Sequence, residues 1–93
     1  MAEMAGDIGT ALAVTVRFFA AARGAAGTES DLVTMQPGAT VADVVAELCC
    51  RSDELARVLQ RCSFLCDGVA VRNRGATLRS GQTLDVLPPF AGG

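Results

Sequence analysis

Residues 40–49 constrain the fold of this chain most strongly, because their pattern fits an amphipathic helix that must lie on another layer. Thr40 and Asp43 have the spacing of a capping box, in which a hydroxyl and a carboxylate each accept a hydrogen bond from an amide at the helix start. Apolar side chains then recur at i, i+3, i+4, i+7 and i+8, namely Val41, Val44, Val45, Leu48 and Cys49. One continuous stripe of this kind is buried against a sheet.

The segments that flank this helix alternate between apolar and polar residues, which is the period of half-buried strands. In residues 13–19, one face carries Val14, Val16 and Phe18. We expect strands at residues 13–19, 29–35, 63–66, 69–72 and 83–87, with turns at Pro37-Gly38, Asp67-Gly68 and Ser80-Gly81. A shorter helix follows Ser52. The predicted class is α+β, with a mixed sheet of four to five strands covered by one main helix.

The chain divides into three predicted parts. Residues 1–11 have no period, and we expect a disordered N-terminal extension. Residues 12–87 form one domain, and residues 88–93 form a flexible tail. Within the domain, residues 20–27 contain only Ala, Gly and Arg23, so we expect a loose connection outside the core. A chain of 93 residues buries only about 60 to 65% of its unfolded surface, which leaves no room for a large enzyme with a deep cleft.

The charged residues exclude several functions. All eight basic residues are arginines, and the chain has no Lys or His, so the usual general bases and nucleophilic amines are absent. The arginines are scattered and the formal charge is -2, which argues against a nucleic-acid partner. The longest stretch without a charge, residues 32–42, is too short to span a membrane, and the N-terminus lacks the positive region of a signal peptide. We expect a cytoplasmic protein.

Four cysteines raise the question of a metal or a disulfide. Zinc sites favour two-residue spacers and often include His, whereas this chain has Cys49, Cys50, Cys62 and Cys66. We favour the interpretation that Cys49 continues the helix stripe, and that Cys62 and Cys66 alternate with Phe64 on one strand face as small apolar residues. No metal ligand is therefore predicted, although a small cysteine-bound metal protein stays an alternative.

The last six residues carry the clearest chemistry. Pro88 and Pro89 end the last strand, because neither can donate to a sheet ladder, and they stiffen the exit of the tail. After Phe90 and Ala91 come two glycines, Gly92 and Gly93, around whose backbone a narrow channel of another protein can close. Small residues are also common at frayed chain ends, so the two glycines alone are weak evidence for a function. The combination of strand, proline pair and diglycine favours a carboxylate presented to another protein's active site.

The chain resembles the MoaD/ThiS-type sulfur carriers with a ubiquitin-like β-grasp fold, and most closely the small subunits of molybdopterin synthase. The resemblance covers residues 13–93. It rests on the segments VTVRFFAAAR at residues 14–23, LRSGQTLDVL at residues 78–87 and PPFAGG at residues 88–93. Two features depart from the usual pattern: Asp67-Gly68 stands where relatives often have an Asn-containing turn, and Gln82 where an acidic residue is frequent.

The resemblance implies a chemistry for the tail. An E1-like adenylyltransferase and sulfurtransferase uses ATP and magnesium to adenylate the carboxylate of Gly93, and a persulfide then converts it to a thiocarboxylate. The tail enters the large subunit of molybdopterin synthase, where sulfur passes to cyclic pyranopterin monophosphate. Two such transfers build the dithiolene of molybdopterin. The small subunit holds no permanent cofactor, the large subunit supplies the catalytic side chains, and two copies of each subunit form a heterotetramer.

Strand facing predicts a partner-binding surface beside the tail. Phe19 lies on the same face of the first strand as Thr15 and Arg17. Leu87 lies on the same face of the last strand as Asp85. In a β-grasp sheet the first and last strands are parallel neighbours, so both apolar residues should lie at the same end, facing away from the helix. The resemblance implies further residues of this partner-binding surface. Arg23 forms an ion pair with an acidic side chain of the partner, and the base of the tail contributes Pro88 and Pro89. Alternatively, Phe19 covers residues 20–27 as a satellite of the core.

Two other functions fit the same fold and tail. One is a sulfur carrier for thiamine synthesis, cysteine synthesis or tRNA thiolation. The other is a ubiquitin-like modifier or interaction module, whose terminal glycine would form an amide bond with a lysine of a target protein.

Overall fold

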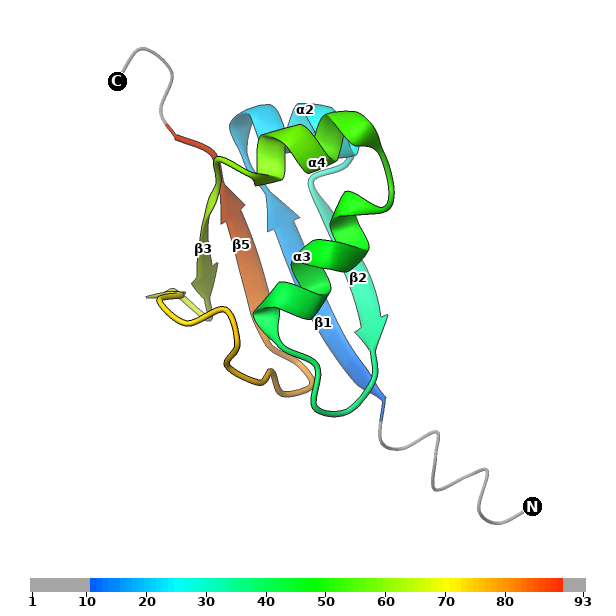
Figure 1. The fold of residues 1–93 in the computed structure, drawn as a ribbon, viewed down its shortest axis with the longest axis vertical. Helices are drawn as coiled ribbons and strands as arrows, with labels where there is room; N and C mark the ends of the chain where they lie inside the picture. The colour runs from blue at the N-terminus through cyan, green and yellow to red at the C-terminus, as the bar shows by residue number, and fades with distance from the viewer. Residues whose placement is uncertain (1–10, 90–93) are drawn as a thin grey trace, which may run out of the picture.

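Five strands form one mixed sheet, in which the first and last strands lie side by side and parallel (Figure 1). The computed structural model describes residues 11–89. The strands are β1 (Leu12–Phe18), β2 (Ser30–Met35), β3 (Ser63–Cys66), β4 (Val69–Ala70) and β5 (Thr83–Leu87), in the sheet order β2-β1-β5-β3-β4. Every other pair of neighbours is antiparallel. The predicted mixed sheet is confirmed.

One predicted strand is shorter than expected. The alternation at residues 69–72 predicted four residues of strand, whereas β4 ends at Ala70. Beyond it the chain enters a turn in which the Asn73 side chain accepts a hydrogen bond from the Gly75 amide. The Val71 amide still donates to the Phe64 carbonyl at 2.9 Å, so the pairing with β3 stops just before this turn.

The two predicted helix starts are confirmed by their caps. Helix α3 (Val41–Cys49) begins with a complete capping box, in which the Asp43 amide donates to Thr40 Oγ1 at 3.2 Å and the Thr40 amide donates to Asp43 Oδ2 at 2.9 Å. Helix α4 (Asp53–Leu59) begins at Ser52, whose Oγ accepts from the Leu55 amide at 3.0 Å. Both caps satisfy amides that the first turn of a helix leaves without partners.

The loose connection predicted at residues 20–27 is wrong, because these residues form helix α2 (Ala20–Ala26). Alanine has the highest helix propensity, so the segment needs no broad apolar stripe to become helical. Gly27 closes the helix in the left-handed region, with φ +78°, and its amide donates to the Arg23 carbonyl at 2.9 Å. Ala22 is fully buried and belongs to the core.

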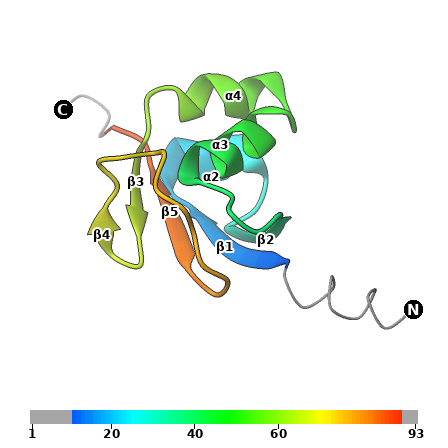
Figure 2. The same ribbon diagram turned by 60° about the horizontal axis from the view of Figure 1, so that its bottom comes forward.

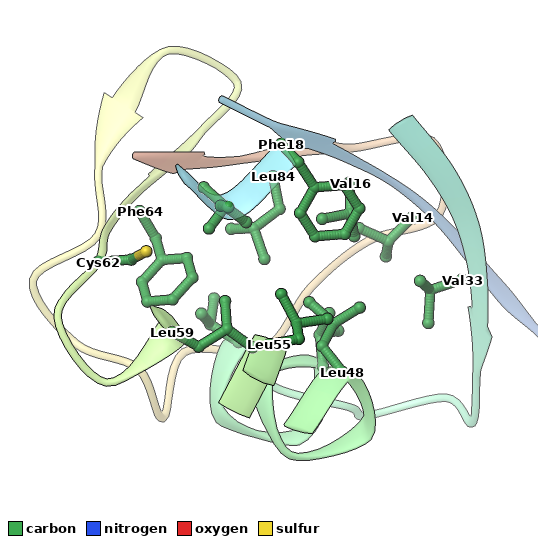
Figure 3. Packing of buried hydrophobic residues seen from close by; sticks show 14 of the residues in the cluster. Val14, Val16, Phe18, Val33, Leu48, Leu55, Leu59, Cys62, Phe64 and Leu84 are labelled. Atoms are coloured by element: carbon green, nitrogen blue, oxygen red, sulfur yellow. The ribbon is translucent and has the colours of Figure 1, made fainter. Parts of the chain in front are cut away.

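The core lies between one face of the sheet and the helices. Helix α3 crosses that face, and α2 packs against α4 at the end where β1 and β5 finish (Figures 1 and 2). Side chains from the strands and from α3 and α4 meet in between (Figure 3). The largest fully buried ones are Val14, Val16, Val44, Leu48, Leu55, Leu59, Leu84 and Val86. The opposite face of the sheet is not covered by any helix of residues 11–89.

Two further sequence predictions concern the N-terminal extension and membrane-spanning segments. The expected extension at residues 1–11 lies outside the described residues, apart from Ala11, which is exposed. None of the helices found between residues 11 and 89 has the length and apolar character needed to cross a membrane.

Candidate functional site

The base of the predicted tail lies at one end of the central strands. Strand β5 ends at Leu87, followed by half-buried Pro88 and exposed Pro89. The remaining predicted tail residues, including the proposed sulfur-bearing group, lie outside the described residues: Phe90, Ala91, Gly92 and Gly93. What the structure describes is therefore the platform from which this tail starts.

The parallel register of β1 and β5 brings Phe19 beside Leu87. Phe18 is the register partner of Val86, and the Phe19 amide donates to the Val86 carbonyl at 3.3 Å. The next residue, Ala20, has a φ of +50°, a left-handed conformation that is costly for a residue with a Cβ, and it turns the chain sharply into α2. The predicted proximity of Phe19 and Leu87 is confirmed, whereas their contact with a partner stays a prediction.

Phe19 is an exposed aromatic residue rather than a satellite of the core. It keeps 38% of its surface exposed and is not among the apolar residues that pack against the buried cluster. Helix α2 packs against α4 and buries Ala22 in the core, so residues 20–27 do not need Phe19 as a cover. An exposed ring beside the tail is what a docking surface requires.

An ion pair that strand alternation alone did not reveal lies next to Phe19. Arg17 and Asp85 are register partners on β1 and β5. Arg17 Nε donates to Asp85 Oδ1 at 2.7 Å and Nη2 donates to Oδ2 at 3.0 Å, and the guanidinium carbon lies 5.3 Å from the centre of the Phe19 ring. The hydrogen bonds to Asp85, and then its charge, raise the pKa of the Arg17 guanidinium. Two features together indicate this ion pair: Arg17 and Asp85 lie on the same face of the sheet, and the parallel register places them opposite each other.

Arg23 has a partner within the chain. It projects from α2, and its Nη2 donates to Glu29 Oε2 at 2.8 Å in an exposed ion pair. This second ion pair, together with Arg17 and Phe19, lines a shallow hollow of about 230 Å³. We call the surface formed by Arg17, Phe19, Arg23 and Leu87 the tail-end face. The predicted pairing of Arg23 with an acid of another protein stays a prediction.

The two departures from the family pattern contact each other at the other end of β5. Asp67 and Gly68 both have a positive φ, of 50° and 84°, which suits a tight turn between β3 and β4. Gln82 Nε2 donates to Asp67 Oδ2 at 3.2 Å, and the Thr83 amide donates to Asp67 Oδ1 at 2.9 Å. The hydrogen bonds from Thr83 and Gln82, with the nearby charge of Arg79, lower the pKa of Asp67. These residues support the turn and lie away from the tail.

Three of the four cysteines, Cys49, Cys62 and Cys66, occupy apolar positions, as predicted. Cys49 and Cys66 are half-buried beside the core, Cys62 is buried, and Cys50 is exposed at the end of α3. Burial raises the pKa of the Cys62 and Cys66 thiols, which favours the neutral form. Within residues 11–89, no three side chains of the types that bind metals are grouped as a metal site would require.

Comparisons with known proteins agree with this geometry. The model of the ThiS family matches residues 16–93. The solved structures similar to this chain include the HVO 2177 protein of Haloferax volcanii, at 29% identity and a TM-score of 0.78, covering 90% of this chain and 89% of that one. SAMP1 of the same organism has 26% identity and a TM-score of 0.77, covering 87% and 99%. The predicted β-grasp fold is thereby confirmed.

A more distant likeness involves a complex. Subunits 1 and 2 of the molybdopterin-converting factor from Helicobacter pylori 26695 include a chain that is 23% identical, with a TM-score of 0.65, covering 88% of this chain and 100% of that one. This identity supports a common fold and nothing finer. No curated protein matches the chain significantly.

Proposed function

Because the chain belongs to the ThiS family, we propose that it is the sulfur carrier of a molybdopterin synthase, with the carboxylate of Gly93 as the group that bears the sulfur. The observation that carries this proposal is the position of the tail base: β5 ends at Leu87 beside the exposed ring of Phe19. The proline pair follows directly, and the diglycine comes two residues later. A thin arm that leaves from the edge of a docking surface can reach a deep active site of a bound partner.

The proposed chemistry begins with activation of a poor electrophile. A carboxylate resists attack until one oxygen becomes part of a good leaving group, and adenylation by an E1-like enzyme with ATP and magnesium provides that group. The terminal sulfur of a persulfide then attacks the acyl carbon and AMP leaves, which gives an acyl disulfide. A thiol reductant cleaves its S–S bond, becomes part of a new disulfide, and releases the thiocarboxylate. In the large subunit this sulfur passes to cyclic pyranopterin monophosphate, and a second charged carrier completes the dithiolene.

The described residues supply docking rather than catalysis. The titratable side chains of the tail-end face, Arg17 and Arg23, are already engaged in ion pairs with Asp85 and Glu29. The chain has no Lys or His to act as an acid or base. We propose that the large subunit supplies the catalytic side chains, and that Phe19, Leu87 and the proline pair contact it in a cytoplasmic heterotetramer. The complex of subunits 1 and 2 from Helicobacter pylori supports a partner of this kind.

Intact-mass measurement tests the carrier chemistry. The chain is incubated with its activating enzyme, ATP with magnesium, a persulfide donor and a thiol reductant, and the expected mass corresponds to replacement of one oxygen by sulfur at Gly93. A variant lacking Gly93 should stay unchanged in mass while keeping the folded spectrum. An unchanged mass for the natural chain would rule out the carrier function.

Reconstitution tests the pathway. Thiocarboxylated chain, the molybdopterin synthase large subunit and cyclic pyranopterin monophosphate should yield molybdopterin. A thiocarboxylate that forms but is not used by the large subunit would point to thiamine synthesis, cysteine synthesis or tRNA thiolation.

A second candidate function is protein modification, which the likeness to SAMP1, described as a small archaeal modifier protein, favours. In that case Gly93 would form an amide bond with a lysine of a target protein. Mass spectrometry of conjugates in cells would distinguish the two functions, because a modifier leaves its C-terminal residues attached to target lysines and a sulfur carrier leaves none.

A further inference from the structure

Asp85 is buried on the face of the sheet that no described helix covers. It is 7% exposed, and among residues 11–89 it is the one buried charged residue. Its neighbours in the sheet register are Arg17 on β1 and half-buried Leu65 on β3. Both carboxylate oxygens accept hydrogen bonds from Arg17, so the charge is compensated within the chain.

Stability alone does not account for this ion pair. Only the Asp85 side of the pair is buried, since 52% of the Arg17 side chain stays exposed. Removing the Asp85 carboxylate from water costs free energy that its hydrogen bonds with Arg17 offset, and apolar side chains at both positions would avoid that cost. The surroundings already offer apolar neighbours in Leu65 and Leu87, which would pack on an apolar pair. The pair does fix the orientation of one group, the guanidinium of Arg17.

Arg17 is held from two sides and still faces solvent. Asp85 binds its Nε and Nη2, the Phe19 ring lies against the guanidinium, and 52% of the side chain stays exposed. Among the described residues, Arg17 makes no other side-chain hydrogen bond, so its other N–H groups are available to a partner. A planar donor group that is already oriented loses little conformational entropy when a partner binds.

A partner that covers Phe19 and Leu87 also removes water from Arg17. A buried donor that lacks an acceptor costs free energy, so the partner surface must provide oxygen atoms at this point. The charges of the face add to zero, because Arg17 is matched by Asp85 and Arg23 by Glu29. This balance favours neutral acceptors over a carboxylate, which would lie close to the two acids.

We propose that Arg17 determines the specificity of the tail-end face, by donating to neutral oxygen acceptors, main-chain carbonyl or side-chain amide oxygens, on an otherwise apolar surface of the synthase large subunit. The inference rests on the proposed function, since it names the chemistry of that partner. Arg17 was not among the docking residues predicted from the sequence, and its role depends on its ion pair with Asp85.

Binding measurements with a double variant test the proposal. Arg17→Leu combined with Asp85→Leu removes the donor group without leaving a buried charge. We expect this variant to fold and to bind the purified large subunit about 10-fold to 100-fold more weakly than the natural chain, which is the loss expected for hydrogen bonds from a charged donor. A matched control, Asp31→Asn with Arg51→Gln, removes an ion pair between β2 and the segment after α3 and should bind normally.

Salt dependence identifies the acceptor. Between about 0.05 and 0.5 M salt, docking to neutral oxygens should change the dissociation constant of the natural chain little, because no free charges meet. A strong weakening by salt that the double variant lacks would indicate a carboxylate acceptor and overturn the proposed partner chemistry.

Other outcomes separate this inference from the proposed function. A folded double variant that binds as tightly as the natural chain would overturn the role of Arg17 and leave the carrier function intact. A natural chain that does not bind the large subunit would overturn both. Where the double variant does not fold, Arg17→Lys replaces it: this variant keeps a charge opposite Asp85 but lacks the planar fork, and it should also bind more weakly.

Discussion

Asp67 and Thr83 exchange two hydrogen bonds between the β3–β4 turn and the start of β5. The Asp67 amide donates to the Thr83 carbonyl at 2.8 Å, and the Thr83 amide donates to Asp67 Oδ1 at 2.9 Å. The turn is thereby attached to the strand that leads, at its other end, to the tail. Since one of the two bonds ends on a carboxylate, this attachment depends on pH.

Replacing Asp67 by Asn should remove a pH-dependent part of the stability. Hydrogen bonds lower the pKa of Asp67 below its ordinary value of 3.8, so the ionised form stabilises the folded state above that value. This contribution is lost as the pH falls through the lowered pKa. Urea unfolding should therefore show Asp67→Asn to be less stable than the natural chain at pH 7, with a gap that closes in acid. A gap that stays constant from neutral to strongly acidic pH would contradict this role.

Leu48 and Cys49 are adjacent on α3 but should respond differently to truncation. Leu48 is fully buried, so Leu48→Ala leaves a cavity and should lower the free energy of unfolding by about 2 to 5 kcal/mol. Cys49 is half-buried, and Cys49→Ala should cost about 1 kcal/mol or less. Denaturant unfolding of both variants measures the difference. Equal losses would mean that the apolar stripe of α3 is not oriented as described.

The elements with local signals were predictable from the sequence. The alternation around Val16 gave the facing of β1, and the Thr40–Asp43 capping box gave the start of α3, because both patterns depend on neighbours within a few residues. Helix α2 was missed because alanines carry no apolar period: only Ala22 is buried, and the helix depends on packing against α4.

The candidate site was also predictable from the sequence only in part. The proximity of Phe19 and Leu87 followed from strand facing and the parallel order of the strands. The pairing of Arg17 with Asp85 joins residues 68 positions apart and depends on the exact register, which no local pattern encodes. The turn contact between Asp67 and Gln82 is also tertiary, and the sequence offered only their separate departures from the family pattern.

The reactivity of the cysteines should follow their burial. Cys50 is exposed and should react first with iodoacetamide at neutral pH, whereas Cys62 is 5% exposed and its thiol has a raised pKa because of desolvation. Peptide mapping after timed labelling should find Cys62 modified only when the chain unfolds. Rapid labelling of Cys62 in the folded chain would show that the end of β3 opens readily.

Phe19 and Leu32 allow a matched test of the tail-end face, because both are exposed apolar residues of the uncovered side of the molecule. Phe19 lies beside the tail base, whereas Leu32 lies on the edge strand β2 and is 61% exposed. Neither belongs to the core, so both alanine variants should stay folded. Leu32→Ala should cost about 0.5 kcal/mol or less, and Phe19→Ala about 1 kcal/mol, because it also removes the contact of the ring with Arg17. Phe19→Ala should nevertheless weaken binding to the synthase large subunit at least about 10-fold, as expected for an aromatic anchor, and slow sulfur transfer at low carrier concentration. Leu32→Ala should bind normally, and equal effects of the two substitutions would place the docking surface across the whole sheet rather than at its tail end.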